Sequence, residues 1–370
     1  MTSGLQHYTI TIIAEGPLFV GSGQSIGKKE YLFHPRRNQV SIPDMGRLYR
    51  FLQEKRLTDA YESFMLNERN DFSDWLRTHH ILDEQCRPWI AYTLDSGDAV
   101  FATRGKKEIA TFVKDAYGCP YVPGSSLKGA LRTALLAAMI MEQPQQFQRN
   151  RQEVRSARLD GRPRKLLKRE TDHLEQEAFY TLGRDKETGR NAVNDILGGL
   201  RISDSAPLSL EDLTLCQKID VLRNGSQRRL PILRECLKPG TELHFTLTID
   251  PKLCPVTPQR LLHAAMELVS LYEKYALQFF PMDDILGGGN LYLGGGCGFF
   301  SKTVLYPLLG ERDGLEKTVA LLHRQFPRHM HLQDRRLGVS PHTVKCAKYR
   351  GELYEMGACT MEVQPFSADV

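Results

Sequence analysis

The stretch from Tyr121 to Met141 constrains the fold more than any other part of the sequence. Pro123 and Gly124 interrupt an extended entry, and a hydroxyl of Ser125 or Ser126 can then accept the free N–H groups of a first helical turn. Apolar residues follow at helical spacing, namely Leu127, Ala130, Leu131, Ala134, Leu135, Ala138 and Met139. The stretch therefore predicts a helix over residues 125–141 that buries one face in a core.

Two cations near the start of this helix suggest an anion site. Lys128 and Arg132 lie four residues apart, so both are expected on one helix face, close to free N–H groups and serine hydroxyls. An ordinary buried helix with two solvated cations is the alternative. The glycine spacing matches a nucleotide-binding P-loop, but Ala130 and Leu131 stand where Lys and Ser/Thr are required. A nucleic-acid backbone is therefore the favoured anion.

Composition sets only broad limits on function. The chain has 370 residues, of which 41% are hydrophobic, which is enough for two domains or for one domain with large insertions. Its net charge of +5 is compatible with binding to nucleic acid. The eight cysteines include no Cys-x-x-Cys pair, which predicts a reduced, cytoplasmic protein without a zinc site. No apolar run of membrane length and no signal peptide are recognised, so we expect no membrane partner.

Alternation and helical spacing predict the order of the main elements. We expect strands over residues 7–14, 199–205, 241–249 and 291–305, and helices over residues 125–141 and 258–280. This is the βαββαβ order of a ferredoxin-like α+β fold, which places both helices on one face of an antiparallel sheet. The glycine-rich ends of the first and last strands are expected to lie near the start of the helix over residues 125–141.

The remaining segments are expected to be insertions in a core of residues 1–305. Residues 31–42 predict a hairpin, and residues 45–115 predict a helical insertion. Residues 142–197 form an arginine-rich arm that is expected to be mobile when free, because its apolar residues are sparse. Such an arm favours RNA or an acidic partner over a purely solvated segment.

Asn224-Gly225 lies between two strand-like runs and predicts a long basic hairpin over residues 213–236, which we expect to protrude. Residues 306–370 predict a C-terminal α+β extension, helical at first and ending in two strands, which could form a second ferredoxin-like unit. Within it, His329 and His331 lie near Asp334, but histidines two residues apart diverge on a helix, so we expect no metal. No cofactor is expected either.

Five blocks of the sequence resemble the RAMP superfamily of CRISPR RNA-binding proteins. They are residues 16–23, 122–132, 200–204, 239–245 and 294–303. Within the superfamily the chain is most similar to the family of fifth subunits of the type III-A Csm effector complex, through its length, the strand at 200–204 and the Gly-Phe-Phe-Ser-Lys-Thr end of the last block. The resemblance implies a non-catalytic RNA-binding subunit that caps an antiviral ribonucleoprotein at the 3′ end of the guide RNA and supports guide maturation.

The resemblance also implies partners. These are the 3′ region of the CRISPR guide RNA, the target RNA, the repeated Csm backbone subunit, the small helical Csm subunit and host maturation nucleases. It gives the hairpin at 213–236 the role of a thumb against the guide–target duplex. Target-cleaving backbone subunits carry an aspartate soon after the first glycine-rich segment. Residues 24–30 contain none, so no target cleavage is expected.

The expected RNA-binding residues combine glycines, hydroxyls and cations of these segments. They are Gly21, Gly23, Lys28, Lys29, Ser125, Ser126, Lys128, Arg132, Arg201, Arg223, Arg228, Arg229, Gly295, Gly296 and Lys302. The alternative function is a metal-independent RAMP endoribonuclease that processes precursor CRISPR RNA. That chemistry needs a general base, for which His7, His34 and His329 are candidates, but the sequence shows no partner for any of them.

Overall fold

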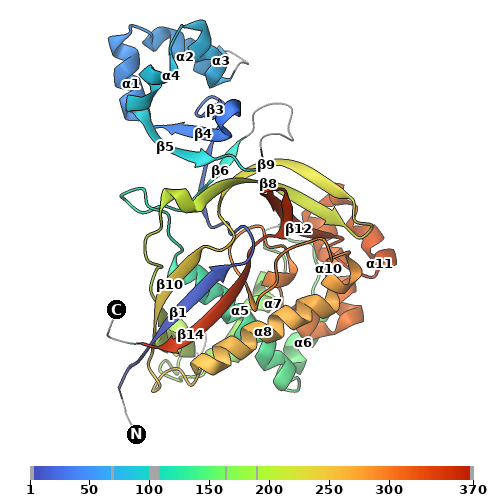
Figure 1. Cartoon of the computed structure of the whole chain (residues 1–370). Helices are drawn as coiled ribbons and strands as arrows, with labels where there is room; N and C mark the ends of the chain where they lie inside the picture. Colours follow the sequence, from blue (N-terminus) through green and yellow to red (C-terminus); the bar gives the residue numbers. More distant parts are fainter. Residues whose placement is uncertain (1–3, 68–70, 100–107, 163–164, 189–190, 367–370) are drawn as a thin grey trace.

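The computed structural model describes residues 4–67, 71–99, 108–162, 165–188 and 191–366. Two β-sheets form the body of the molecule, and the long helices lie against the first of them (Figure 1). A small group of helices, drawn in blue, lies at one end of the molecule, beyond the second sheet (Figure 1).

The first sheet has five strands in the order β11-β14-β1-β10-β7. Their bounds are β1 Gln6–Ala14, β7 Leu200–Ile202, β10 Glu242–Ile249, β11 Leu291–Tyr292 and β14 Ala358–Pro365. β1 is antiparallel to both neighbours, with Ile10 opposite Phe245 on one side and Val363 on the other. With the helices between them, β1, β7, β10 and β14 follow the βαββαβ order, which confirms the predicted ferredoxin-like fold.

The predicted strand over residues 291–305 is wrong beyond its first two residues. β11 ends at Tyr292, and a glycine-rich loop and the short helix α9 (Leu305–Leu309) follow. Glycine weakens a strand because it has no side chain to pack, so this loop does not continue the ladder. β14, from the C-terminal segment, takes the place beside β1 instead.

Two long helices cover one face of this sheet. α5 (Gly124–Glu142) and α8 (Pro258–Tyr275) pack against each other and against the strands. β10 alternates as predicted, since Leu243 and Phe245 are buried under the helices while Glu242 and His244 are exposed. The predicted helix over residues 258–280 is confirmed as far as Tyr275.

The second sheet has nine strands and is built around the predicted hairpin. Seven strands follow the order β2-β6-β9-β8-β5-β4-β3, and β12 pairs with both β8 and β13. Their bounds are β2 Gly21–Ile26, β3 Leu32–His34, β4 Gln39–Pro43, β5 Ile90–Asp95, β6 Ile109–Phe112, β8 Leu213–Leu222, β9 Gln227–Leu237, β12 Thr343–Tyr349 and β13 Glu352–Glu355. β3 and β4 form the hairpin predicted over residues 31–42, and the chain turns between them at Pro35–Arg37.

The β8–β9 hairpin turns at Asn224-Gly225, as predicted, and Gly225 has a φ of 80° that suits glycine. The hairpin does not protrude from the sheet, contrary to the expectation. β6 pairs with β9, and β5 and β12 pair with β8, so both strands have further neighbours. Residues 227–232 of β9 are mostly exposed, while β8 is largely buried.

The helical insertion is shorter than the predicted residues 45–115. It contains α1 Met45–Glu54, α2 Thr58–Asn67, α3 Phe72–Thr78 and α4 Asp83–Cys86. Its own core is aromatic, with Phe64, Phe72, Trp75 and Trp89 buried together. The chain then returns as strands β5 and β6, because Ile90–Asp95 and Ile109–Phe112 pair within the second sheet.

The described residues of the arginine-rich arm include two helices packed on the core, contrary to the expectation of a mobile segment. It contains α6 (Gln148–Ser156) and α7 (Lys168–Phe179). Its few apolar residues gather on one side, and Phe147, Val154 and Phe179 are buried in the main core. Because these few apolar residues recur at helical spacing, they lie on one side of the helices and pack against the main core.

The described residues from 306 to 366 do not form a sheet of their own. α10 (Glu311–Gln325) and α11 (Asp334–Leu337) confirm the expected helical stretch, but β12 and β14 join two sheets formed by earlier residues. β13 was not predicted. None of the helices in the described ranges combines the length and the apolar character needed to cross a bilayer.

Candidate nucleic-acid interface

The start of α5 is held by a carboxylate rather than by a serine. The N–H group of Gly124 donates to Oδ1 of Asp204 at 2.8 Å, and neither Ser125 nor Ser126 caps the helix. A Cβ atom at Gly124 would lie 2.2 Å from the carbonyl oxygen of Ser203, so only glycine fits this close approach. The predicted serine cap is wrong, because the end of β7 brings an anion to the helix start from a distant part of the chain.

The two cations of α5 both contact the protein. Nζ of Lys128 donates to the carbonyl oxygens of Leu197 and Leu200, each at 2.7 Å. Burial lowers the pKa of this lysine. Arg132 donates to Glu175 at 2.9 Å and to Asp195 at 2.7 Å. Direct phosphate contact by Lys128 and Arg132 stays a prediction, but the structure uses both side chains to join α5 to neighbouring segments.

Arg132→Ala is expected to destabilise the fold by about 2 kcal/mol, because it leaves Glu175 and Asp195 without their shared cation in a partly buried place. Chemical denaturation of the purified chain measures the change. Arg149→Ala is the matched control, since Arg149 forms an exposed pair with Glu153 within α6 and should change stability by less than about 0.5 kcal/mol. Equal losses in the two variants would contradict a structural role for Arg132.

The glycine-rich ends predicted to meet the first helix do so, around a pocket of about 350 Å³ that we call the glycine pocket. Its lining includes Gly21 from β2, Ser126 from the first turn of α5, and Gly294, Gly295 and Lys302 from the loop after β11. Lys302 is exposed. Three predicted sites that lie far apart in the sequence are thus brought to one place.

Close backbone approaches shape this pocket. The N–H group of Gly295 donates to the carbonyl oxygen of Phe19 at 2.6 Å. Gly294 has a φ of 80°, and a Cβ atom there would lie 2.4 Å from the same oxygen. Gly23, on β2, is exposed and has a φ of 84°. Gly294 therefore has to be glycine so that the loop after β11 can pack against Phe19 at the pocket wall.

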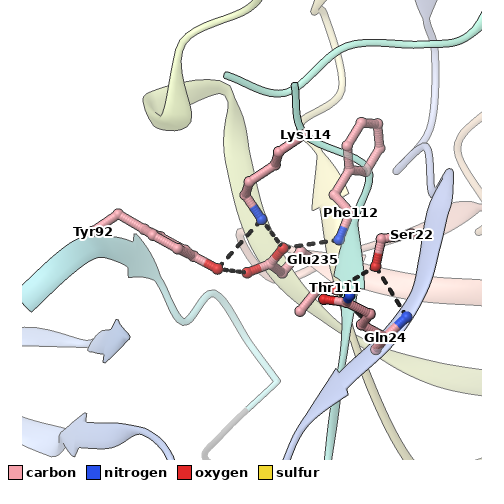
Figure 2. A network of polar contacts seen from close by, with 7 residues as sticks. All are labelled: Ser22, Gln24, Tyr92, Thr111, Phe112, Lys114 and Glu235. Atoms are coloured by element: carbon pink, nitrogen blue, oxygen red, sulfur yellow. Dashed lines mark hydrogen bonds and ion pairs between the residues drawn. The ribbon is translucent and has the colours of Figure 1, made fainter. Parts of the chain in front are cut away.

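A buried hydrogen-bond network joins β9 to β5 and to β6, the strand that pairs with β2. Glu235 of β9 accepts from the Tyr92 hydroxyl at 2.7 Å, from the Phe112 N–H group at 2.8 Å and from Nζ of Lys114, and Figure 2 shows how these groups converge. Burial and the charge of Glu235 raise the pKa of Tyr92 far above its ordinary value.

The same figure shows how β2 is joined to β6. The hydroxyls of Ser22 and Thr111 lie 2.6 Å apart, and the Ser22 hydroxyl also accepts from the N–H group of Gln24. Together with the Glu235 network, these bonds hold the edge strand that begins at Gly21.

Two lysines predicted to bind RNA, Lys28 and Lys29, follow β2, and Lys29 contacts the helical insertion. Nζ of Lys29 donates to the carbonyl oxygens of Phe64 and Met65 at 2.7 and 2.8 Å. Lys28 is half-buried beside it in sequence. Lys29 therefore anchors the insertion to the second sheet in this structure.

The predicted arginines are spread over two sheets. Arg201 is exposed on β7, and Arg228 and Arg229 are exposed on the outer half of β9. Arg223 donates to the carbonyl oxygen of Leu337 at 2.7 Å, so it connects the hairpin to the C-terminal helices. None of these four arginines lines the glycine pocket, and their contact with RNA stays a prediction.

The three histidines considered for an endoribonuclease lie apart and have separate contacts. Nδ1 of His7 lies 3.2 Å from the Thr248 hydroxyl, and Nε2 of His34 lies 3.1 Å from the Ser41 hydroxyl. His329 stacks on Phe326. No two of these three histidines share a site.

A different group of titratable residues was missed by sequence reasoning. His331, Asp334 and His342 lie together, and the last of these comes from beyond the helical stretch. The sequence indicates His329 and His331 as a pair near Asp334, but His342 lies eight residues past Asp334, so no local spacing marks it.

The fold and its glycine-rich loops are those of a known superfamily. The model of the RAMP superfamily matches residues 11–290, and the chain belongs to this superfamily. Over nearly its whole length the chain is similar to proteins named "CRISPR system Cms protein Csm5". It is 28% identical to the one from Mycobacterium tuberculosis, with 98% of this chain and 99% of that protein covered. It is 26% identical to the one from Streptococcus thermophilus, with 85% and 84% covered.

Two solved structures have a similar fold. One is a chain of the "Cryo-EM structure of Csm-crRNA-target RNA ternary complex in type III-A CRISPR-Cas system", with a TM-score of 0.69, 22% identity and 96% of this chain and 100% of that chain covered. The other is the "Crystal structure of T.onnurineus Csm5", with a TM-score of 0.62, 20% identity and 95% and 99% covered. None of these names describes an enzyme.

Proposed function

We propose that the chain is a non-catalytic, RNA-binding subunit of a type III-A CRISPR ribonucleoprotein of the Csm kind. Membership of the RAMP superfamily and similarity to Csm5 proteins from end to end support this function. The similar fold in a complex described with crRNA and target RNA supports RNA as the ligand. The subunit caps the complex at the 3′ end of the guide RNA and supports guide maturation.

The observation that carries the proposal is the convergence at the glycine pocket. Gly21, Gly294 and Gly295 pack against Phe19 and form one wall of the pocket, while Ser126 and Lys302 offer a hydroxyl and a cation to a sugar-phosphate backbone at the same place. Contacts of this kind position the phosphate backbone without reading bases. That suits a subunit that must hold guide RNAs of many sequences.

The proposed partners follow from the same resemblance. They are the 3′ region of the guide RNA, the target RNA, the repeated backbone subunit and the small helical subunit of the complex, with host nucleases acting during maturation. The thumb role that the resemblance implies for the β8–β9 hairpin assigns contact with the guide–target duplex to Arg228 and Arg229, which are exposed on β9.

Lys302→Ala is expected to weaken binding of single-stranded RNA to the full chain and to lower the slope of log affinity against log salt by about one. The reason is the loss of one phosphate contact at the glycine pocket. Filter binding over a series of salt concentrations measures both quantities. Lys252→Ala is the matched control, because Lys252 is exposed in the turn after β10 and does not line the pocket. An unchanged affinity and slope for Lys302→Ala would count against the site.

A further inference from the structure

A second pocket is lined by the β8–β9 hairpin, the glycine-rich loop and the C-terminal segment. We call it the histidine pocket; its volume is about 490 Å³, which is within the range of about 300–1,000 Å³ of small-ligand sites. Gly296 and Gly298 line it, whereas Gly294 and Gly295 line the glycine pocket. One short loop therefore contributes to both pockets.

The histidine pocket is cationic. Four basic side chains line it, namely Lys218, Arg228, Arg234 and Lys345. Among its described lining residues, Asp220 is the one carboxylate, and it pairs with Lys345 at 2.8 Å and with Lys218 at 3.9 Å. An excess of positive charge remains inside a concave surface, which attracts an anion.

A buried carboxylate holds two imidazoles at this pocket. Asp334 is fully buried and lies 3.0 Å from Nδ1 of His331 and 2.7 Å from Nδ1 of His342. The Ser340 hydroxyl donates to the same carboxylate at 2.7 Å. Burial alone would raise the pKa of Asp334, but these hydrogen bonds lower it below its ordinary value.

The bond to Asp334 leaves Nε2 as the remaining polar atom of each imidazole, and in the doubly protonated ring this atom donates a hydrogen bond, as an anion requires. His331 and His342 both line the pocket, so each can present this atom to a ligand there. The three residues could also be considered as metal ligands. However, the carboxylate already accepts three hydrogen bonds, and the neighbouring basic side chains oppose a cation. An anionic ligand fits this set better.

An aromatic pair lies at the same pocket. The rings of Phe326 and His329 stack with centroids 5.4 Å apart, and both residues line the pocket. Phe326 is 46% exposed although it is large and apolar. Burial and the nearby positive charges, His331 first, lower the pKa of His329, which favours an uncharged ring. Exposed flat rings beside cations are typical of surfaces that stack nucleobases.

We infer that the histidine pocket takes up one unstacked nucleotide of the bound RNA. Its phosphate would lie against Lys345, Arg228 and the two imidazoles, and its base against Phe326 and His329. The inference rests on the proposed function, because it takes the ligand to be RNA, and it adds a nucleotide-sized site that is separate from the glycine pocket.

Photo-cross-linking of the full chain tests the site directly. Single-stranded RNA carries one 4-thiouridine, moved through the strand one position at a time, and mass spectrometry identifies the cross-linked peptide. We expect one position to cross-link to the segment that contains Phe326 and His329. Phe326→Ala should lower that yield about tenfold through the lost stacking contact. Phe366→Ala is the matched control, because Phe366 is 51% exposed and lies outside the pocket lining.

The RNA affinity measured in parallel separates the two proposals. RNA that binds with a Lys302-dependent affinity but never cross-links to this segment would overturn the pocket assignment and leave the proposed function standing. Loss of a cross-link on addition of AMP, without release of the RNA, would support the pocket as a nucleotide site. If the histidine pocket binds AMP but no RNA position cross-links to the segment containing Phe326 and His329, then RNA is not the ligand of this pocket. Absence of any RNA binding would overturn both proposals.

Discussion

Glu235→Ala is expected to lower the free energy of unfolding by about 4 kcal/mol, which is a large part of the stability of a typical domain. The Glu235 side chain has no exposed surface and accepts from three donors on two neighbouring segments. Its removal leaves Lys114, which is 15% exposed, without its counter-charge, and leaves the N–H group of Phe112 unpaired. Chemical denaturation followed by circular dichroism measures the loss.

Two comparisons show whether the effect arises from the network. Glu235→Gln keeps the shape and one acceptor oxygen, so it should destabilise less than alanine. Glu362→Ala changes an exposed glutamate on β14 and should have little effect. If Glu235→Ala unfolds at the same denaturant concentration as the unchanged protein, then the network does not stabilise the second sheet.

The second large effect is a pH dependence that arises from Glu355. This carboxyl group is 3% exposed and accepts from the hydroxyls of Tyr272 and Tyr292, at 2.7 and 2.8 Å. Burial raises its pKa from 4.5 to about 7, although the two tyrosine bonds oppose this shift and the charge of Glu273 adds to it. In the folded protein the group is therefore protonated at a pH where the unfolded chain has already lost the proton.

Since the folded state binds the extra proton, stability falls as the pH rises from about 4.5 to about 7, by about 3 kcal/mol in total, and is then constant with respect to this group. Glu355→Gln should remove this contribution and be more stable than the unchanged protein above pH 7, because a neutral amide can keep both tyrosine bonds. Denaturation at several pH values measures the difference between the two proteins. Glu352→Gln, at an exposed position of the same strand, is the control. A difference that does not change with pH would contradict the assignment.

Elements with strong local signals were predictable from the sequence. The alternation of β10, the Asn224-Gly225 turn and the apolar spacing of α5 each depend on neighbours within a few residues. The meeting of the glycine-rich loops with the start of α5 followed once the strand order was known.

Features that depend on distant partners were not predictable in this way. Lys128 and Arg132 have the spacing of a phosphate site, but their carbonyl and carboxylate partners lie more than forty residues further along the chain. Asp204 reaches the start of α5 from the end of β7, so no residue beside Gly124 reveals it. The histidine pocket likewise required His342, which only the tertiary fold brings to Asp334.

The position of β14 has a consequence for how the chain is made. β1 is among the first described residues to leave the ribosome, yet one of its two neighbours in the sheet is residues 358–365. Until those residues are synthesised, the backbone groups along one edge of β1 have no strand to pair with, and an unpaired edge invites association with other chains. The first sheet of the RAMP core can therefore be completed only after residues 358–365 have been synthesised, and a nascent chain halted before residue 358 should expose that edge of β1.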